Sequence, residues 1–332
     1  MTSVERASTS LGFRDDPCRP VRGGESFGVT PPRYGQTMYK TTGTLSKDVK
    51  DPKTSIGQYL RAAFPNMKPL QTEYKELAGG LVVDSMGANA GTVGTAFDLV
   101  IRLMIEPDVT PKSTLALYPF NTTYHQVVND LACIAGRSDD EELATRAVWA
   151  LALCVNAYRA GPAWAPLVPD LVDGGSFFVD KMLEQADDNA VAELLALKKL
   201  SELRLIPKLA GPFSLGPTFE LSKPGASQRI GAEADLVAGG LLLDIKTILA
   251  PKNKAGLRPD VLKPDSVYQL LGYALLDYSN QYNIEQLGIY SARYGSLMEW
   301  PLERATSLLS GGKFDLSVAR QEVWDLMQQE LA

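Results

Sequence analysis

The sequence has very little histidine and cysteine, the residues on which many catalytic and metal sites depend. It contains one histidine, His125, and three cysteines, Cys18, Cys133 and Cys154. A single histidine with no partner at a known spacing gives no support to a catalytic triad. The cysteines form neither a metal-ligand spacing nor an even-numbered disulfide set, which indicates a reducing, cytoplasmic setting and argues against an iron–sulfur cluster.

Long apolar runs are also missing. No stretch is apolar enough over the length that a bilayer requires, and residues 1–39 are polar and lack the apolar segment of a signal peptide. Residues 85–95 are rich in glycine but lack the Gly-Lys-Ser/Thr of a phosphate-binding loop and the spacing of a dinucleotide fingerprint. We therefore expect neither a membrane span nor a nucleotide cofactor.

The charge is acidic overall but uneven along the chain. The formal net charge of −6 does not favour nucleic-acid binding, yet residues 196–265 hold 11 Lys and Arg against 7 Asp and Glu. A locally basic surface can attract a polyanion through its backbone charge. Ordinary charge scatter on a solvated surface is the alternative, and composition does not separate the two. The length of 332 residues with 45% hydrophobic residues is enough for a large core, in one domain or two.

The segment 232–247 predicts a β-hairpin. Two apolar, β-prone runs flank Gly239-Gly240, a dipeptide suited to the positive φ angles of a two-residue turn. With the turn at these glycines, Asp235 lies opposite Asp244, and Lys246 shares their face because side chains alternate along a strand. The opposite face is wholly apolar, and we expect it to face the core.

Two adjacent carboxylates beside an ammonium group favour metal chemistry. Like charges placed opposite each other destabilise a strand pair, so the arrangement calls for a cation. Mg²⁺ takes oxygen ligands and can activate water for hydrolysis of a phosphodiester, while the lysine orients or deprotonates that water or neutralises developing charge. The alternative is a solvated strand end in which Lys246 screens Asp235. From the hairpin alone the two interpretations are about even.

The helix that follows adds a second pattern. Residues 264–278 predict a helix in which Gln269 and Tyr273, spaced i and i+4, lie on one face. Taken alone, this helix favours an ordinary amphipathic element with Tyr273 in the core.

In combination, these residues resemble a known superfamily. Asp235, Asp244-Ile-Lys246 and Gln269-Leu-Leu-Gly-Tyr273 occur in the order found in the PD-(D/E)XK nucleases, in their RecB-like exonuclease branch with a Gln-x-x-x-Tyr motif. Each motif alone is common, whereas the three together in this order are considerably more specific. The resemblance covers residues 235–273.

The resemblance implies a role for each hairpin residue. Asp235 and Asp244 would bind Mg²⁺ or Mn²⁺, the carbonyl of Ile245 would be a further ligand, and Lys246 would be the catalytic lysine. The stretch ending at Asp98 also resembles the first core helix of these nucleases, where many members have a metal-binding histidine. Asp98 is therefore a candidate ligand, and a solvated helix carboxylate is an equally weighted alternative.

Substrate contacts are expected from the helix and from the loop before it. Gln269 and Tyr273 would contact the DNA backbone or support the site, as the resemblance implies. Lys252 and Lys254 belong to a basic loop between the hairpin and this helix, and we expect them to bind substrate.

Periodicity and turn residues predict the remaining elements. Helices are expected at 56–64, 95–105, 143–158 (capped by Ser138), 177–205 (interrupted at Asp187-Asp188) and 316–331, strands at 218–222, 229–237 and 241–248, and a last hairpin at 287–294 and 296–302. In that hairpin, Arg293 and Tyr294 either reach the substrate or lie on an edge-strand surface.

The expected fold is α/β, with a PD-(D/E)XK (restriction-endonuclease-like) core whose mixed sheet of about five strands is flanked by helices. Residues 1–50 are expected to form a poorly ordered or wrapping arm. Residues 51–106 and 213–332 would form the nuclease core, and 107–212 a helical insertion that covers the cleft, grips DNA or binds a protein partner.

The expected function is that of a metal-dependent DNA nuclease, an activity that the resemblance connects with DNA repair, recombination or phage defence. Two other classes stay open: a non-catalytic nucleic-acid- or protein-binding module that retains the fold, and a metal-dependent enzyme acting on a small phosphate substrate. The intact Asp, Asp and Lys set argues against the module, and the basic loop favours a polymer. Exonuclease and endonuclease activity are not distinguished.

Overall fold

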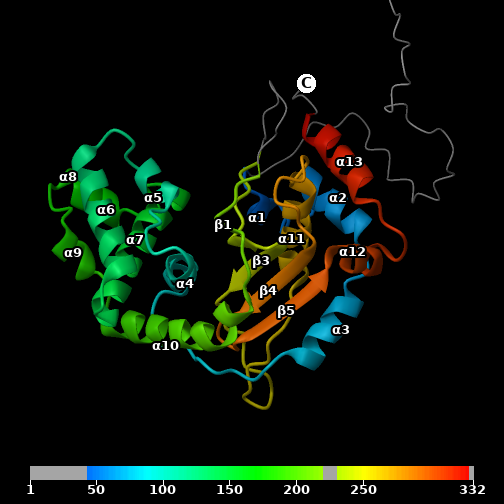
Figure 1. Cartoon of the computed structure of the whole chain (residues 1–332), viewed down its shortest axis with the longest axis horizontal. Coiled ribbons are helices and arrows are strands. Elements are labelled where there is room, and N and C mark those ends of the chain that lie inside the picture. The colour runs from blue at the N-terminus through cyan, green and yellow to red at the C-terminus, as the bar shows by residue number, and fades with distance from the viewer. Residues whose placement is uncertain (1–42, 220–229, 329–332) are drawn as a thin grey trace, which may run out of the picture. The chain divides into compact units, whose positions relative to one another are not determined.

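A five-stranded mixed sheet organises the fold (Figure 1). The computed structural model describes residues 43–219 and 230–328. The strands are β1 Phe213–Leu215, β2 Leu236–Ala238, β3 Leu241–Lys246, β4 Gln286–Ser291 and β5 Ser296–Pro301. They are arranged in sequence order, and all neighbours are antiparallel except β3 and β4, which are parallel. The predicted α/β class and mixed sheet are confirmed at this level.

Helices flank this sheet, and those of residues 112–137 and 167–183 pack on α7 (Glu141–Ala160) instead (Figure 1). The helices are α1 Leu45–Asp48, α2 Ser55–Ala63, α3 Lys68–Leu77, α4 Ala90–Ile105, α5 Lys112–Ala116, α6 Thr122–Arg137, α7 Glu141–Ala160, α8 Leu167–Asp173, α9 Val179–Leu183, α10 Asp188–Arg204, α11 Pro264–Leu276, α12 Leu302–Ser310 and α13 Leu316–Gln328, with a 3-10 turn at Ile206–Lys208. Among these helices, none combines the length and apolarity needed to cross a membrane.

The turn between β2 and β3 has the predicted register. Leu236 pairs with Leu243, Val237 with Leu242 and Ala238 with Leu241, the pair next to the turn. Gly239 and Gly240 have φ angles of 54° and 86°, in the region that favours glycine. Pairing ends at Leu236, so Asp235 lies just before the strand instead of forming the predicted ladder pair with Asp244.

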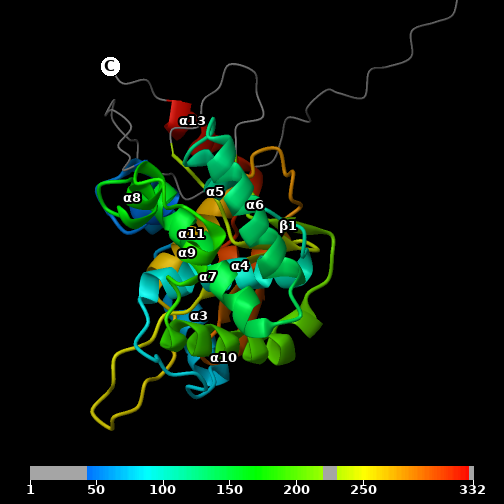
Figure 2. The ribbon, with the colours of Figure 1, turned by 90° about the vertical axis from the view of Figure 1, so that its left-hand side faces the viewer.

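Both faces of the sheet are covered. Apolar side chains of β2, β3 and β4 on one face join the cluster formed by α4, α7 and α10, as predicted for the apolar face of the hairpin. Val237 and Leu242, on the other face, are also buried, and α11 packs against β3. Figure 2 shows α4, α7 and α10 from their outer side. Because α11 is the crossover between the parallel strands β3 and β4, it is positioned directly beside the end of the hairpin.

Helix α4 approaches the sheet closely at its first turns. Asn89 caps the helix through Thr92 N–H, so it begins at Ala90, earlier than predicted. A methyl group added at Gly94 would lie 3.3 Å from the hydroxyl of Thr247, the residue after β3. The small residues at this helix start therefore serve close packing, as the sequence indicated.

Side-chain caps determine where several helices begin. Thr54 caps α2, and Asp187 caps α10 and so produces the expected interruption. Helix α7 is capped by Asp140 instead of Ser138, because Ser138 ends the preceding helix. Helices α5–α10 lie within the predicted insertion, whose boundaries stay a prediction.

The described end of the predicted N-terminal arm packs on the fold. Leu45 and Val49 are fully buried, and Leu45 N–H donates to the carbonyl of Gly231. The rest of the arm (residues 1–42) lies outside the described residues. So do the predicted strand ends at 220–222 and Arg229, and the last residues of the C-terminal helix.

A buried ion pair joins α10 to the turn between β4 and β5. The Arg293 guanidinium binds the Glu193 carboxylate, and the exposed fractions of the two side chains are 2% and 0%. Arg293 also donates to the carbonyl of Thr247 over 2.6 Å, and Glu193 accepts the N–H of Met86 over 2.7 Å. Both expectations for Arg293, a substrate contact or an edge-strand surface, are therefore wrong, because its guanidinium group is buried and paired with Glu193.

Loss of this pair is expected to destabilise the protein strongly. Glu193→Gln leaves the Arg293 charge buried without a counter-ion, which costs about 3–5 kcal/mol of unfolding free energy. The matched control is Glu184→Gln, which removes an exposed i,i+3 pair with Lys181 and should change stability by less than about 0.5 kcal/mol. Urea unfolding of both variants measures the difference, and a cost below about 1 kcal/mol for Glu193→Gln would contradict the assignment.

Candidate active site

The candidate site lies at the end of the hairpin, where Asp235 is fixed by a backbone contact. Its Oδ2 accepts the N–H of Ile245 over 2.7 Å, and its carbonyl accepts the N–H of Gly216 over 3.0 Å. The Asp235 side chain therefore accepts a hydrogen bond from a backbone N–H of β3 that lies beyond the last residue pair of β2 and β3. This contact holds the carboxylate beside the segment Asp244–Lys246.

Asp244 is a buried carboxylate paired with Lys246. Both of its oxygens lie 2.8 Å from the Lys246 ammonium nitrogen, and its side chain is 3% exposed. Burial raises the pKa of Asp244 to about 6, with Lys246 opposing this rise and Asp235 adding to it. Oδ2 makes no hydrogen bond within the described structure, only this ion contact. A buried carboxylate oxygen that accepts no hydrogen bond is suited to binding a cation.

Lys246 is a charged group that reaches the surface. Its side chain is 23% exposed, and it donates a second hydrogen bond, 3.3 Å long, to Gln269 Oε1. Burial lowers the pKa of Lys246, but Asp244 and Asp235 raise it more, so the net shift is upward. In this arrangement the ammonium group lies between the carboxylate of Asp244 and the amide of Gln269.

The hydrogen bonds continue from Lys246 into α11. Gln269 Nε2 donates to the Tyr273 hydroxyl over 3.0 Å, and that hydroxyl donates to the Glu233 carbonyl over 2.7 Å. Tyr273 is buried, stacks on Phe219, and has a pKa raised by its burial. It lies in the core, as the helix pattern alone favoured, and it also supports the residue that holds Lys246.

Asp98 on α4 faces the site but is bound by an arginine. Arg102 Nη2 lies 2.8 Å from Asp98 Oδ2, and Arg102 Nε donates to Oδ1 over 3.1 Å. Burial raises the pKa of Asp98 to about 7, opposed by Arg102 and increased by the nearby charge of Asp235. The solvated-carboxylate alternative is therefore wrong, and the role as metal ligand stays a prediction.

Sequence reasoning missed a group of charges around Asp98. Arg102 also binds Glu233 over 3.2 Å, and Arg159 lies 3.5 Å from the same Glu233 oxygen. A methyl group at Gly216, where φ is +60°, would lie 2.1 Å from Arg102 Nη1. The i,i+4 spacing of Asp98 and Arg102 on a helix was a signal that could have found this pair.

The donor chemistry fits a hard divalent cation with two protein carboxylates. Asp235 and Asp244 interact electrostatically, and Asp244 offers an oxygen without a hydrogen bond. Across residues 43–219 and 230–328, however, no three Asp, Glu, His or Cys side chains are grouped closely enough to hold a metal ion. Arg102 occupies both oxygens of Asp98. For Ile245, the N–H is engaged by Asp235, and the carbonyl ligand stays a prediction.

Lys252 and Lys254 lie on the loop that begins directly after β3. Both are exposed, and within the described structure neither makes a hydrogen bond or an ion pair. They are outside the chain of contacts from Asp244 to Tyr273 and remain candidates for substrate binding.

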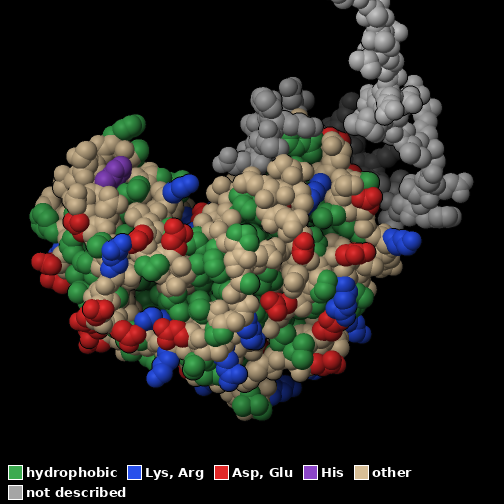
Figure 3. All heavy atoms as spheres, in the orientation of Figure 1, with side chains coloured by type: hydrophobic (Ala, Val, Ile, Leu, Met, Phe, Trp, Pro, Cys, Tyr) green, Lys and Arg blue, Asp and Glu red, His purple; other side chains and the backbone are tan. Residues whose placement is uncertain are grey.

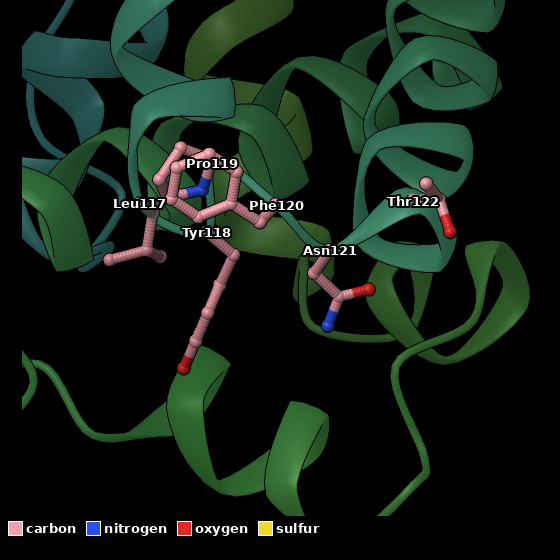
Figure 4. Close-up of a pocket in the computed structure, with 6 residues that line it drawn as sticks. All are labelled: Leu117, Tyr118, Pro119, Phe120, Asn121 and Thr122. Atoms are coloured by element: carbon pink, nitrogen blue, oxygen red, sulfur yellow. The ribbon is translucent and has the colours of Figure 1, made fainter.

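A separate surface pocket lies between α5 and α6. It is lined by residues Leu117–Thr122, none of them charged, and Phe120 is almost fully exposed (Figure 4). None of the predicted site residues lines it. We assign it no part in the candidate chemistry.

The Tyr273 hydroxyl should contribute to stability. Tyr273→Phe leaves the part-buried Glu233 carbonyl without this donor, which should cost about 1–3 kcal/mol of unfolding free energy. Tyr158→Phe, on an exposed ring of α7, is the control and should be neutral. Chemical denaturation checks both, and equal stability of the two variants would show that the hydroxyl contact does not matter.

Comparison of the chain with protein-family models, with curated proteins and with solved structures gives no match. The resemblance of residues 235–273 to the PD-(D/E)XK nucleases therefore rests on the motifs themselves.

Proposed function

We propose that the protein is a Mg²⁺- or Mn²⁺-dependent nuclease that hydrolyses phosphodiester bonds of DNA. One observation carries this proposal: a continuous set of contacts joins the three separate motifs. Asp235 binds the backbone of β3, Asp244 binds Lys246, and Lys246 binds Gln269, which in turn binds Tyr273. Contacts of this kind are expected in a catalytic site that holds a lysine beside two carboxylates.

In the proposed mechanism, Asp235 and Asp244 hold the metal ion. The ion, when bound, supplies a Lewis acid and an activated water. The charged Lys246 faces the same place and stabilises negative charge on a phosphate oxygen. Gln269 orients the ammonium group, and the buried Tyr273 fixes Gln269 through its bond to the Glu233 carbonyl.

The exposed lysines support a polymeric substrate. Lys252 and Lys254 lie on a loop that starts one residue after the proposed catalytic lysine, where they could bind backbone phosphates away from the scissile bond. The preference for DNA over RNA, and a role in repair or phage defence, come from the family resemblance alone.

A non-catalytic binding module is the second candidate, favoured by a specific observation. Each buried carboxylate near the site already has a cationic partner: Arg102 binds Asp98 and Lys246 binds Asp244. A site neutralised in this way could persist without a metal ion and without activity.

Incubation of purified protein with plasmid and linear DNA separates these candidates. We expect cleavage with Mg²⁺ or Mn²⁺, none with EDTA, and a rate reduced about 10²–10³-fold in Lys246→Ala, since a charge-stabilising group is lost. Lys181→Ala, an exposed lysine on α9, is the control and should cleave like the wild type. Undiminished cleavage by Lys246→Ala would refute the site, and DNA binding without any cleavage would favour the module.

Asp235→Asn tests whether the carboxylate has a function beyond structure. The amide oxygen can still accept the Ile245 N–H, so the unfolding free energy should fall by no more than about 1 kcal/mol. Because the charge that would bind the metal is lost, cleavage should fall below detection. Calorimetric titration with Mn²⁺ provides a readout besides activity, and unchanged Mn²⁺ affinity would remove Asp235 from the metal site.

A further inference from the structure

The loop of residues 247–263, between β3 and α11, carries exposed apolar side chains and is held in one conformation by its own hydrogen bonds. It contains no helix or strand, yet it projects from the fold in both ribbon views, where it is yellow (Figures 1 and 2). Leu257 is 65% exposed, and Ile248 and Val261 are also exposed. Figure 3 shows apolar side chains at the lowest point of the face, over this loop, with Lys and Arg side chains on both sides.

The tip of the loop is preformed by Asn253. Its N–H donates to the Leu257 carbonyl over 2.7 Å, and its side-chain oxygen accepts the N–H groups of Ala255 and Leu257 over 2.9 and 3.0 Å. Gly256, with a φ of +76°, allows the tight reversal. Leu257 is thus held in an exposed position without the loop having to order itself on binding.

The base of the loop is also fixed to the fold. Hydrogen bonds run from Tyr74 to Asp260, from Tyr294 to the carbonyl of Arg258, from Arg258 to the carbonyl of Ala250, and from Gln71 to the carbonyl of Leu262. The loop is therefore a stiff projection and not a loose connection.

We propose that this loop is a wedge that opens base-paired DNA at an end, with Leu257 entering the base stack. The inference rests on the proposed nuclease function and adds to it a substrate class, duplex ends. Proteins that unstack bases insert apolar side chains of this kind between base steps and hold the flanking phosphates with cations. Lys252 and Lys254 lie in the sequence next to the tip and provide those cations.

Charge favours DNA over a protein partner. The loop carries Lys252, Lys254, Arg258 and Lys263 against a single acidic residue, Asp260, whose carboxylate is bound by Tyr74. The loop also starts directly after Lys246, so its base adjoins the proposed catalytic lysine.

A fluorescence experiment tests the wedge without requiring cleavage. A blunt DNA duplex carries 2-aminopurine at its penultimate position, and its fluorescence rises when the base is unstacked. The full-length protein is added to saturation in EDTA, as wild type, Leu257→Ala and Leu203→Ala. Leu203 on α10 is 69% exposed and serves as the matched control. Fluorescence anisotropy of an end-labelled duplex gives the affinity of each protein in parallel.

We expect the wild type and Leu203→Ala to raise the fluorescence, and Leu257→Ala to leave it near that of free duplex at saturation. The affinity of Leu257→Ala should fall about tenfold, because the apolar contact between the inserted side chain and the bases is lost. Binding without a rise in fluorescence, an equal rise with Leu257→Ala, or no binding to the duplex would each overturn the wedge. A protein partner would then be the remaining occupant of the loop.

Cleavage assays with Mg²⁺ separate this proposal from the proposed nuclease function. If the wedge is correct, Leu257→Ala lowers the cleavage rate of the blunt duplex about tenfold more than that of single-stranded DNA, and Leu203→Ala lowers neither. A wild type that cleaves neither substrate, yet unstacks the duplex end in EDTA, would refute the nuclease function and leave the wedge standing.

Discussion

The buried pair of Glu193 and Arg293 is the constraint on which the arrangement around the site depends. Two buried charges are tolerated only when each is hydrogen-bonded, and here the additional partners are three backbone groups of two separate segments, the one before α4 and the end of β3. One of them is the carbonyl of Thr247, the residue directly after Lys246. The same pair therefore fixes α10, the segment before α4 and the end of β3, which is where the candidate site begins.

Around the site, charges are balanced almost one for one. Three carboxylates, Asp98, Glu233 and Asp244, form ion pairs with Arg102, Arg159 and Lys246. Asp235 is bound instead by the N–H of Ile245. Lys50 adds a further positive charge near Asp244, yet burial still raises the pKa values of Asp98 and Asp244. A divalent cation would offset the charges of Asp235 and Asp244, which is the electrostatic support for the proposed metal site.

Local features of the fold could be predicted from the sequence, and features that depend on distant partners could not. Gly239-Gly240 fixed the hairpin register because a two-residue turn leaves no freedom in the pairing, and Asp187-Asp188 marked a break in the helical pattern of residues 177–205. Strand β1 was missed because three residues show no periodicity. The burial of Arg293 was missed for a different reason: its partner, Glu193, lies 100 residues away in sequence. For the candidate site, the sequence indicated which residues come together, and the structure added the arginines that hold Asp98 and Glu233.

Gly216 ties the edge of the sheet to these charges mechanically. Its N–H binds the carbonyl of Asp235, and its Cα lies against the Arg102 guanidinium with no room for a side chain. The backbone next to β1 and the charges around Asp98 are therefore in direct contact. A change in the path of the chain at residue 216 would alter both the hydrogen bond to Asp235 and the space that the Arg102 guanidinium occupies.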